Sequence, residues 1–136
     1  MTAVWVNESG TQVTFNFAYE QSGAVYYPDM VKVKVCETKG KVVGFDAVAF
    51  LKNHRSRSAP NTKISLGEAR EKLNKNLSVE ASRLTVIPVD GKEVAAYEFV
   101  CTYKEEETYF IYVDADTGNE VRILNVLNSK QGRILI

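Results

Sequence analysis

The alternation of hydrophobic and polar residues follows the same course twice along the chain. Residues 15–50 read as strand, hairpin, strand, a turn at Lys39-Gly40 and a further strand. Residues 97–126 read in the same order, with the turn at Thr117-Gly118. Internal repetition on this scale predicts two copies of one sheet unit.

A single segment between the two copies has helical spacing. Ser65 with Glu68 three residues later predicts a capping box at the start of a helix. The apolar residues that follow recur at spacings of three and four: Leu66, Ala69, Leu73 and Leu77. Residues 74–78 favour turns and end the helix. The apolar stripe predicts that this helix packs on the second sheet.

The second copy predicts a four-stranded antiparallel meander. A short apolar run at 84–88 is closed by Asp90-Gly91, a strong hairpin signal. An alternating strand over 93–103 and a polar hairpin at 104–107 follow. After the next strand, the turn that ends in Gly118 requires a positive φ, and the last strand covers 120–127.

The first copy aligns with the second, but at an offset that changes along the chain. Its aromatic strand residues match those of the second copy: Phe15, Phe17 and Tyr19 match Tyr97, Phe99 and Cys101. The valines of its next strand match at a shorter offset: Val31, Val33 and Val35 match Tyr109, Ile111 and Val113. The difference predicts that the first hairpin, residues 20–29, is about four residues longer than its partner.

The first copy has no room for a helix ahead of its first strand, which starts near Ala3. We therefore expect the chain to be an excerpt of a longer protein, with that helix before Met1. The predicted fold class is α+β, with two tandem units that are each an antiparallel meander sheet. We predict a truncated, sheet-only unit at 1–54, a linker at 55–61 and a complete unit of helix plus four-stranded sheet at 62–136.

The segment joining the two units, residues 52–61, is basic and rich in serine and contains Pro60. One interpretation is a small docking patch for an anionic partner. The other is a solvated connector between two sheets, which we favour because charged runs between structured segments are commonly of that kind.

Charge and composition exclude several classes of protein. The 17 basic and 17 acidic residues give a net charge of +0, which provides no field to gather nucleic acid or anionic lipid. The longest apolar runs, such as 47–51, are far shorter than the roughly 20 residues needed to cross a bilayer. A composition of 45% hydrophobic and 25% charged residues is typical of a soluble globular domain.

The residues that could bind a metal or a cofactor are few. Strand parity places Cys101 on the apolar face of its strand and Cys36 on the polar face, so we expect no disulfide. Two cysteines and His54 do not supply the four ligands of a structural zinc site. Asp114 and Asp116 ahead of Gly118 are explained by a turn better than by a calcium loop. We predict no metal and no cofactor.

The search for catalytic residues also predicts none. His54, the single histidine, lies in the linker segment, which we expect to be mobile and a poor support for a catalytic triad. The glutamates of 105–107 stand on a hairpin tip, where nothing would raise the pKa of one of them selectively. No glycine-rich phosphate loop has the required spacing. We therefore predict that the chain is not an enzyme.

Four residues of the first unit are candidates for partner binding: Trp5, Tyr26, Tyr27 and Pro28. They fall in the first strand and the extended hairpin, and aromatic residues there are favoured anchors of protein interfaces. The alternative is that they fold back over core left open by the missing helix.

The turn at Asp114 to Val121, with the pattern Asp-x-x-Thr-Gly-x-x-Val, follows a strand and has a Ser-x-x-Glu-Ala helix start upstream. This combination resembles the PepSY domain, a helix followed by an antiparallel sheet. The tandem arrangement, with Tyr-Pro-Asp-Met-Val at 27–31 and Gly-Phe-Asp-Ala at 44–47, resembles a family of spore germination proteins that carry PepSY domains at the C-terminus.

The resemblance implies a non-enzymatic regulatory module outside the cytoplasmic membrane, at the spore membrane or cortex, tethered through an N-terminal segment absent from this chain. It implies a protein partner, a cortex-lytic peptidoglycan hydrolase of the SleB type. The neutral net charge argues against nucleic acid as a partner. The alternative is a peptidase inhibitor that acts like a propeptide, for which residues 20–29 would be the extended segment. A small ligand between helix and sheet is a third possibility. No site residue of the family transfers.

Overall fold

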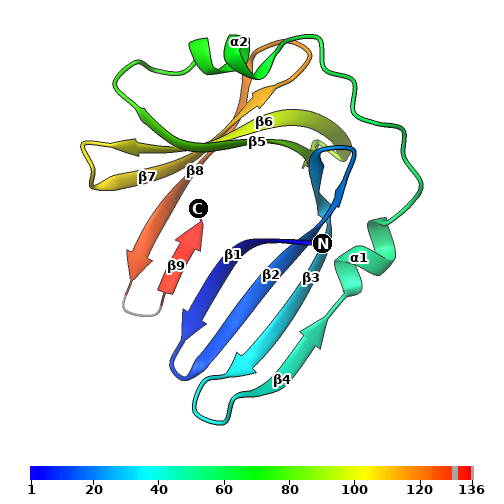
Figure 1. The fold of residues 1–136 in the computed structure, drawn as a ribbon, viewed down its shortest axis with the longest axis vertical. Helices are drawn as coiled ribbons and strands as arrows, with labels where there is room; N and C mark the ends of the chain where they lie inside the picture. Colours follow the sequence, from blue (N-terminus) through cyan, green and yellow to red (C-terminus); the bar gives the residue numbers. More distant parts are fainter. Residues whose placement is uncertain (130–131, 136) are drawn as a thin grey trace.

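The computed structural model describes residues 1–129 and 132–135, which form one sheet with two short helices (Figure 1). The first unit contains four strands and a helix: β1 (Thr2–Ser9), β2 (Gln12–Gln21), β3 (Ala24–Cys36), β4 (Lys41–Asp46) and α1 (Val48–Asn53). The second unit opens with a helix and continues with strands: α2 (Leu66–Glu71), β5 (Ser78–Val89), β6 (Lys92–Tyr103), β7 (Glu107–Asp114), β8 (Glu120–Ser129) and β9 (Gly132–Leu135).

The two predicted meanders are joined edge to edge within a single sheet. Its strand order is β1-β2-β3-β5-β6-β7-β8-β9, and β4 pairs with β3. The link is a parallel pairing between the start of β3 and the middle of β5, in which Ala24 lies opposite Leu84 and Tyr26 opposite Val86. Two separate sheets were expected from the sequence, but β3 is long enough to pair with β4 at one end and with β5 at the other.

The prediction of a long first hairpin is wrong. Ser22 and Gly23 form a tight turn, with φ of 54° and 74°, and β3 begins directly after it. Tyr19 pairs with Tyr26 but Ala18 pairs with Met30, so the additional residues of this copy form a bulge within β3. The extra length therefore continues the strand that joins the two units, and no loop projects from the sheet there.

The helix α2 begins as predicted and ends early. The Ser65 side chain accepts a hydrogen bond from the Glu68 backbone N–H at 3.1 Å, which caps the helix. Ala69 and Leu73 are buried against the second sheet, in a core with Phe99, Cys101 and Ile111 and their neighbours. The prediction of a continuous apolar stripe is wrong for Leu66, which is 40% exposed.

The first unit ends differently from the prediction, because its last strand stops at Asp46. The side chain of Asp46 accepts a hydrogen bond from the backbone N–H of Val48 at 2.9 Å. Such a local bond offers the backbone an alternative to the sheet ladder, and the chain turns into α1. The prediction of a strand continuing to Phe50 is therefore wrong.

Further features concern the strands of the second unit, its last turn and the two cysteines. Strand β5 begins at Ser78, earlier than predicted, and β9 is a fifth strand that the sequence pattern did not predict. Gly118 has φ of 76°, as its turn requires. Cys36 and Cys101 are both free, which agrees with the strand parity.

Candidate protein-interaction surface

The sheet face that carries α2 in the second unit continues into the first, and there it is covered only in part. Leu84 packs both with the core under α2 and with Tyr26. The ring of Tyr19 lies on the same face beside Tyr26 and contacts Phe50 and His54, with the His54 ring 4.6 Å away. The helix α1 and the segment after it therefore cover this end of the first sheet.

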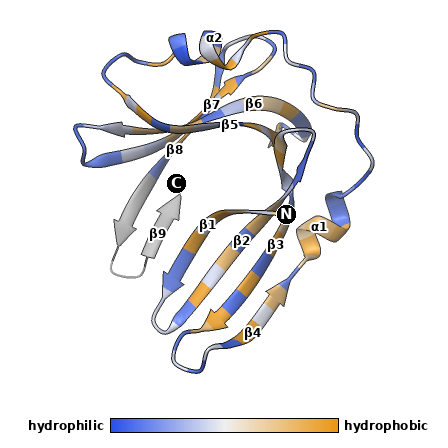
Figure 2. Ribbon diagram, viewed as in Figure 1, coloured by the Kyte–Doolittle hydropathy of each residue, from blue (hydrophilic) through white to orange (hydrophobic). Residues whose placement is uncertain are grey.

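Beyond that cover, apolar side chains of the first unit are open to solvent. The ring of Phe45, on β4, is 70% exposed, and Leu51, on α1, is 78% exposed. We call the exposed hydrophobic residues of these two elements the β4–α1 surface: Val42, Val43, Phe45, Val48 and Leu51. Figure 2 shows this hydrophobic stretch at the outer margin of the sheet. Clustered exposed apolar residues of this kind commonly mark an interaction site.

Cationic side chains surround the β4–α1 surface. The exposed lysines of the neighbouring elements are Lys32, Lys34, Lys39, Lys41 and Lys52. Among the ion pairs of the described residues, none includes any of these lysines. The chain is neutral as a whole, but on this margin the five lysines outnumber the two exposed carboxylates, Glu37 and Asp46.

A buried ion-pair network holds the linker against both units. Asp29, in the β3 bulge, has a fully buried side chain and accepts two hydrogen bonds from Arg57, each of 2.7 Å. Arg57 also donates to Glu93 of β6 twice, at 2.9 Å, and lies over the ring of Tyr26. His54 Nδ1 is 2.7 Å from Asp29. Charge-assisted, bidentate bonds of this type fix geometry strongly.

The linker is mostly exposed, as the sequence led us to expect, but Arg57 and His54 anchor it to the sheet. The side chain of Arg57 is only 8% exposed, and the ring of His54 is stacked on Phe50 at 4.4 Å. Arg57 also donates to the backbone carbonyl of Asn53, whose own side chain donates to the carbonyl of Pro28. These contacts bury Arg57, whereas Lys52 and Arg55 of the same segment stay exposed.

A second polar cluster joins the units on the opposite face of the sheet. Glu98, on β6, is buried and accepts hydrogen bonds from the hydroxyls of Tyr27 and Tyr112 and from Arg83 Nε. Arg83 also donates to the Tyr27 hydroxyl at 2.8 Å. Trp5 lies against Tyr27, with 5.9 Å between ring centroids. Every buried polar side-chain atom in the described part of the chain has a partner, so both clusters are fully satisfied.

The protonation of these groups follows from their surroundings. Burial alone would raise the pKa of Asp29, but hydrogen bonds from Arg57 and His54 outweigh it and hold the pKa below the ordinary value. Burial and the adjacent Glu98 carboxylate raise the pKa of the Tyr27 and Tyr112 hydroxyls. Both tyrosines are thus neutral donors at physiological pH.

The lowered pKa of Asp29 predicts a loss of stability in acid. The contribution of a group whose pKa is depressed by folding is present above its unfolded-state pKa, near 3.8, and is lost as the pH falls through the folded-state pKa. We expect Asp29→Asn to be less stable than the wild type at neutral pH. We also expect it to lose less stability between about pH 5 and about pH 2, where a paired carboxylate takes up its proton. Urea unfolding across this range measures both.

The control for this measurement is Asp116→Asn. Asp116 forms an ion pair with Lys63 at 3.1 Å, but both side chains are exposed. We expect its acid response to match that of the wild type. An Asp29→Asn protein whose stability falls in parallel with the wild type would contradict the assignment.

The geometry gives no support for catalysis. His54 and Asp29 form the pair that a triad would use to orient a base. Within the described residues, no hydrogen bond joins His54 to a hydroxyl or a thiol. No group of three or more metal-ligating side chains occurs in the part of the chain that the structure describes. In that part, no helix is long and apolar enough to cross a membrane.

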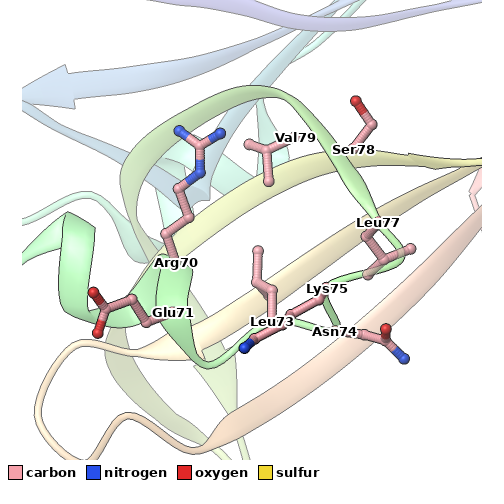
Figure 3. A pocket seen from close by; sticks show the side chains of 8 residues that line it. All are labelled: Arg70, Glu71, Leu73, Asn74, Lys75, Leu77, Ser78 and Val79. Carbon is pink, nitrogen blue, oxygen red and sulfur yellow. The ribbon is translucent and has the colours of Figure 1, made fainter.

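An open hollow of about 750 Å³ lies where α2 ends (Figure 3). Its apolar lining is Leu73, Leu77 and Val79, and Arg70 and Lys75 also border it. This is the place that a small ligand between helix and sheet would occupy. The lining contains no buried charged or polar group that would specify a ligand.

The four predicted partner-binding residues are divided between the two faces of the sheet. Tyr26 is buried beneath Arg57, and Tyr27 belongs to the Glu98 cluster. Trp5 and Pro28 are partly exposed, next to Tyr27. Partner binding by these residues stays a prediction. Of the four, Trp5 and Pro28 have side chains that a partner could reach.

Asp29 and Arg57 were missed because no sequence signal pairs them. They lie in a predicted hairpin and a predicted linker, and their contact depends on the bulge in β3. The β4–α1 surface was missed because residues 47–51 were read as the apolar continuation of a strand.

Two family models match the chain in tandem. The model described as "YpeB sporulation, PepSY1 and PepSY2 domains" matches residues 1–60. The model described as "Peptidase propeptide and YPEB domain" matches residues 63–124. The two matches meet at the end of the linker.

Relatives and a solved structure agree with these matches. Sporulation protein YpeB of Halalkalibacterium halodurans is 36% identical over 80% of this chain and 24% of its own length. Sporulation protein YpeB of Bacillus subtilis is 36% identical over 85% of this chain and 26% of its own length. The Bacillus megaterium YpeB C-terminal domain superposes with a TM-score of 0.85 at 39% identity, covering 93% of this chain and 56% of that one. The chain thus spans about a quarter of the length of the curated relatives that it matches.

Proposed function

Because the chain belongs to the PepSY family, in the tandem arrangement of the C-terminal region of the YpeB sporulation proteins, we propose that it is a non-enzymatic module that regulates a partner protein. The partner we propose is a spore cortex-lytic peptidoglycan hydrolase of the SleB type, which the module binds or stabilises. Its place of action would be extracytoplasmic, at the spore membrane and cortex.

The β4–α1 surface is the observation that supports this proposal best. Exposed apolar residues such as Phe45 and Leu51 cost solubility unless a partner uses them. The buried networks around Asp29 and Glu98 hold the two units in a fixed relation, which presents that surface without a further ordering cost.

The test is a calorimetric titration of the purified chain against a SleB-type hydrolase from the same organism, with the activity of the hydrolase assayed alongside. We expect saturable binding and no hydrolysis of peptidoglycan by the chain alone. A titration that shows no heat of binding at low and at high salt would overturn direct association.

The alternative is a peptidase inhibitor that acts like a propeptide, and the words "Peptidase propeptide" in the description of the second family model favour it. An inhibitor of this kind needs an extended segment that enters the protease cleft. The segment expected to do so, residues 20–29, instead forms a tight turn and part of the sheet. Slowing of a secreted protease by the chain would support the alternative over the hydrolase partner.

A further inference from the structure

The outer side of β4 is an open sheet edge. In residues 1–129 and 132–135, β4 pairs with β3 alone, and the chain leaves the sheet after Asp46. The backbone N–H and C=O groups along the other side of β4 are therefore free to pair with another strand.

The second unit shows where the two repeats differ beside this edge. The start of its strand β8 corresponds to β4, and β8 continues to Ser129, where residues 126–129 pair antiparallel with β9 (Figure 1). The residues of the first unit that correspond to 126–129 form α1 instead, so no strand of the described chain follows on that side of β4.

Charge and hydrophobicity specify the chemistry of the missing strand. Val42 and Phe45 offer apolar contacts along the edge. The exposed lysines of the margin, which include Lys34 on β3 and Lys41 on β4, outnumber its exposed carboxylates, Glu37 and Asp46. An incoming strand that alternates apolar with acidic residues would satisfy both. Antiparallel pairing with a second copy would set Lys41 opposite Asp46, but it would leave an excess of lysines on both margins without acidic partners, which like-charge repulsion disfavours.

We propose that the open edge of β4 takes up an extended, acidic and apolar segment of a partner protein as an additional antiparallel strand. Main-chain hydrogen bonds supply affinity in this mode, and side-chain contacts on alternate residues supply specificity. The inference deepens the proposed function, because it rests on the chain being an interaction module, and it names the surface and the kind of segment bound.

Two synthetic peptides test the chemistry, one in which glutamate alternates with valine and one in which lysine replaces every glutamate. By fluorescence anisotropy we expect the acidic peptide to bind at least about tenfold more tightly than the basic one, with an affinity that falls as salt is added. Equal affinity for the two peptides, or no binding of either, would overturn the proposal.

Two pairs of variants locate the site. Phe45→Asp should weaken binding of the acidic peptide at least about tenfold, whereas Ile123→Asp, at the corresponding exposed position of β8, should not. Lys41→Glu should weaken binding and flatten its salt dependence, and Lys92→Glu, on β6, should do neither. Circular dichroism checks that each variant is folded. Wild-type affinity in folded Phe45→Asp would rule out the β4 edge.

Two further measurements separate this inference from its competitors. Sedimentation velocity should show a monomer, and a dimer abolished by Phe45→Asp would assign the edge to a second copy instead. Hydrolase binding that survives Phe45→Asp would leave the proposed function standing and overturn the β4 site. Peptide binding at β4 without any hydrolase binding would support the site and remove the hydrolase as partner.

Discussion

Replacement of Arg57 with alanine is expected to lower the free energy of unfolding by about 3–5 kcal/mol. Asp29 has no exposed surface and depends on Arg57 for two of its hydrogen bonds, so the substitution leaves a buried carboxylate without its main counter-charge. Glu93 loses its two bonds from the same guanidinium. Urea denaturation of the two proteins at neutral pH measures the difference.

Arg55→Ala is the matched control for Arg57→Ala. Arg55 belongs to the same linker and contacts the same carboxylate, Glu93, at 3.2 Å, but its side chain is 61% exposed. An exposed ion pair of this kind contributes about 0–1 kcal/mol. Equal losses of stability for the two variants would show that burial of the Asp29 network does not control the stability of the junction.

Leu73→Ala is expected to destabilise the protein by about 2–5 kcal/mol. The side chain is buried where the chain leaves α2, in the core that Phe99 and Ile111 form. Truncation removes apolar contacts with that core and enlarges the open hollow that Leu73 lines. Thermal and urea unfolding of the variant give the loss, which should be accompanied by a clear fall in melting temperature.

Leu66→Ala tests the same helix with the same chemical change. Leu66 lies in the first turn of α2, is 40% exposed and belongs to no buried cluster of the described residues. Its truncation should change stability by less than about 0.5 kcal/mol. Similar effects at the two positions would mean that α2 packs through a different side than the structure shows.

Local signals in the sequence predicted much of this fold, including the capping box at Ser65, the turn at Gly118 and the separation of the two cysteines. Each of these depends on residues that are close along the chain or on strand parity. The resemblance to the PepSY family and the α+β tandem architecture, drawn from such signals, are confirmed. The assignment of a linker at 55–61 stays a prediction about domain boundaries.

Several features that escaped prediction depend on contacts between distant segments. The parallel pairing of Tyr26 with Val86 joins strands that no short turn connects, so no turn signal in the sequence predicts it. The burial of Arg57 depends in turn on where that pairing places Asp29. A charged residue in a basic run gives the same pattern whether it is solvated or buried in an ion pair. The interaction surface was hidden for a related reason, because an apolar run such as 47–51 is compatible with a strand or a helix.

The parallel pairing of β3 with β5 has a consequence for how the protein reaches this structure. During synthesis, β3 emerges well before β5. The first residues of β3 therefore lack a pairing strand on one side until the linker, α2 and β5 have been synthesised. Non-local pairings of this type are slow to form, since the loop between them must close first. The first repeat therefore completes its sheet late, and a chain interrupted between the repeats exposes a second open edge, at Ala24 to Tyr26, that is prone to aggregate.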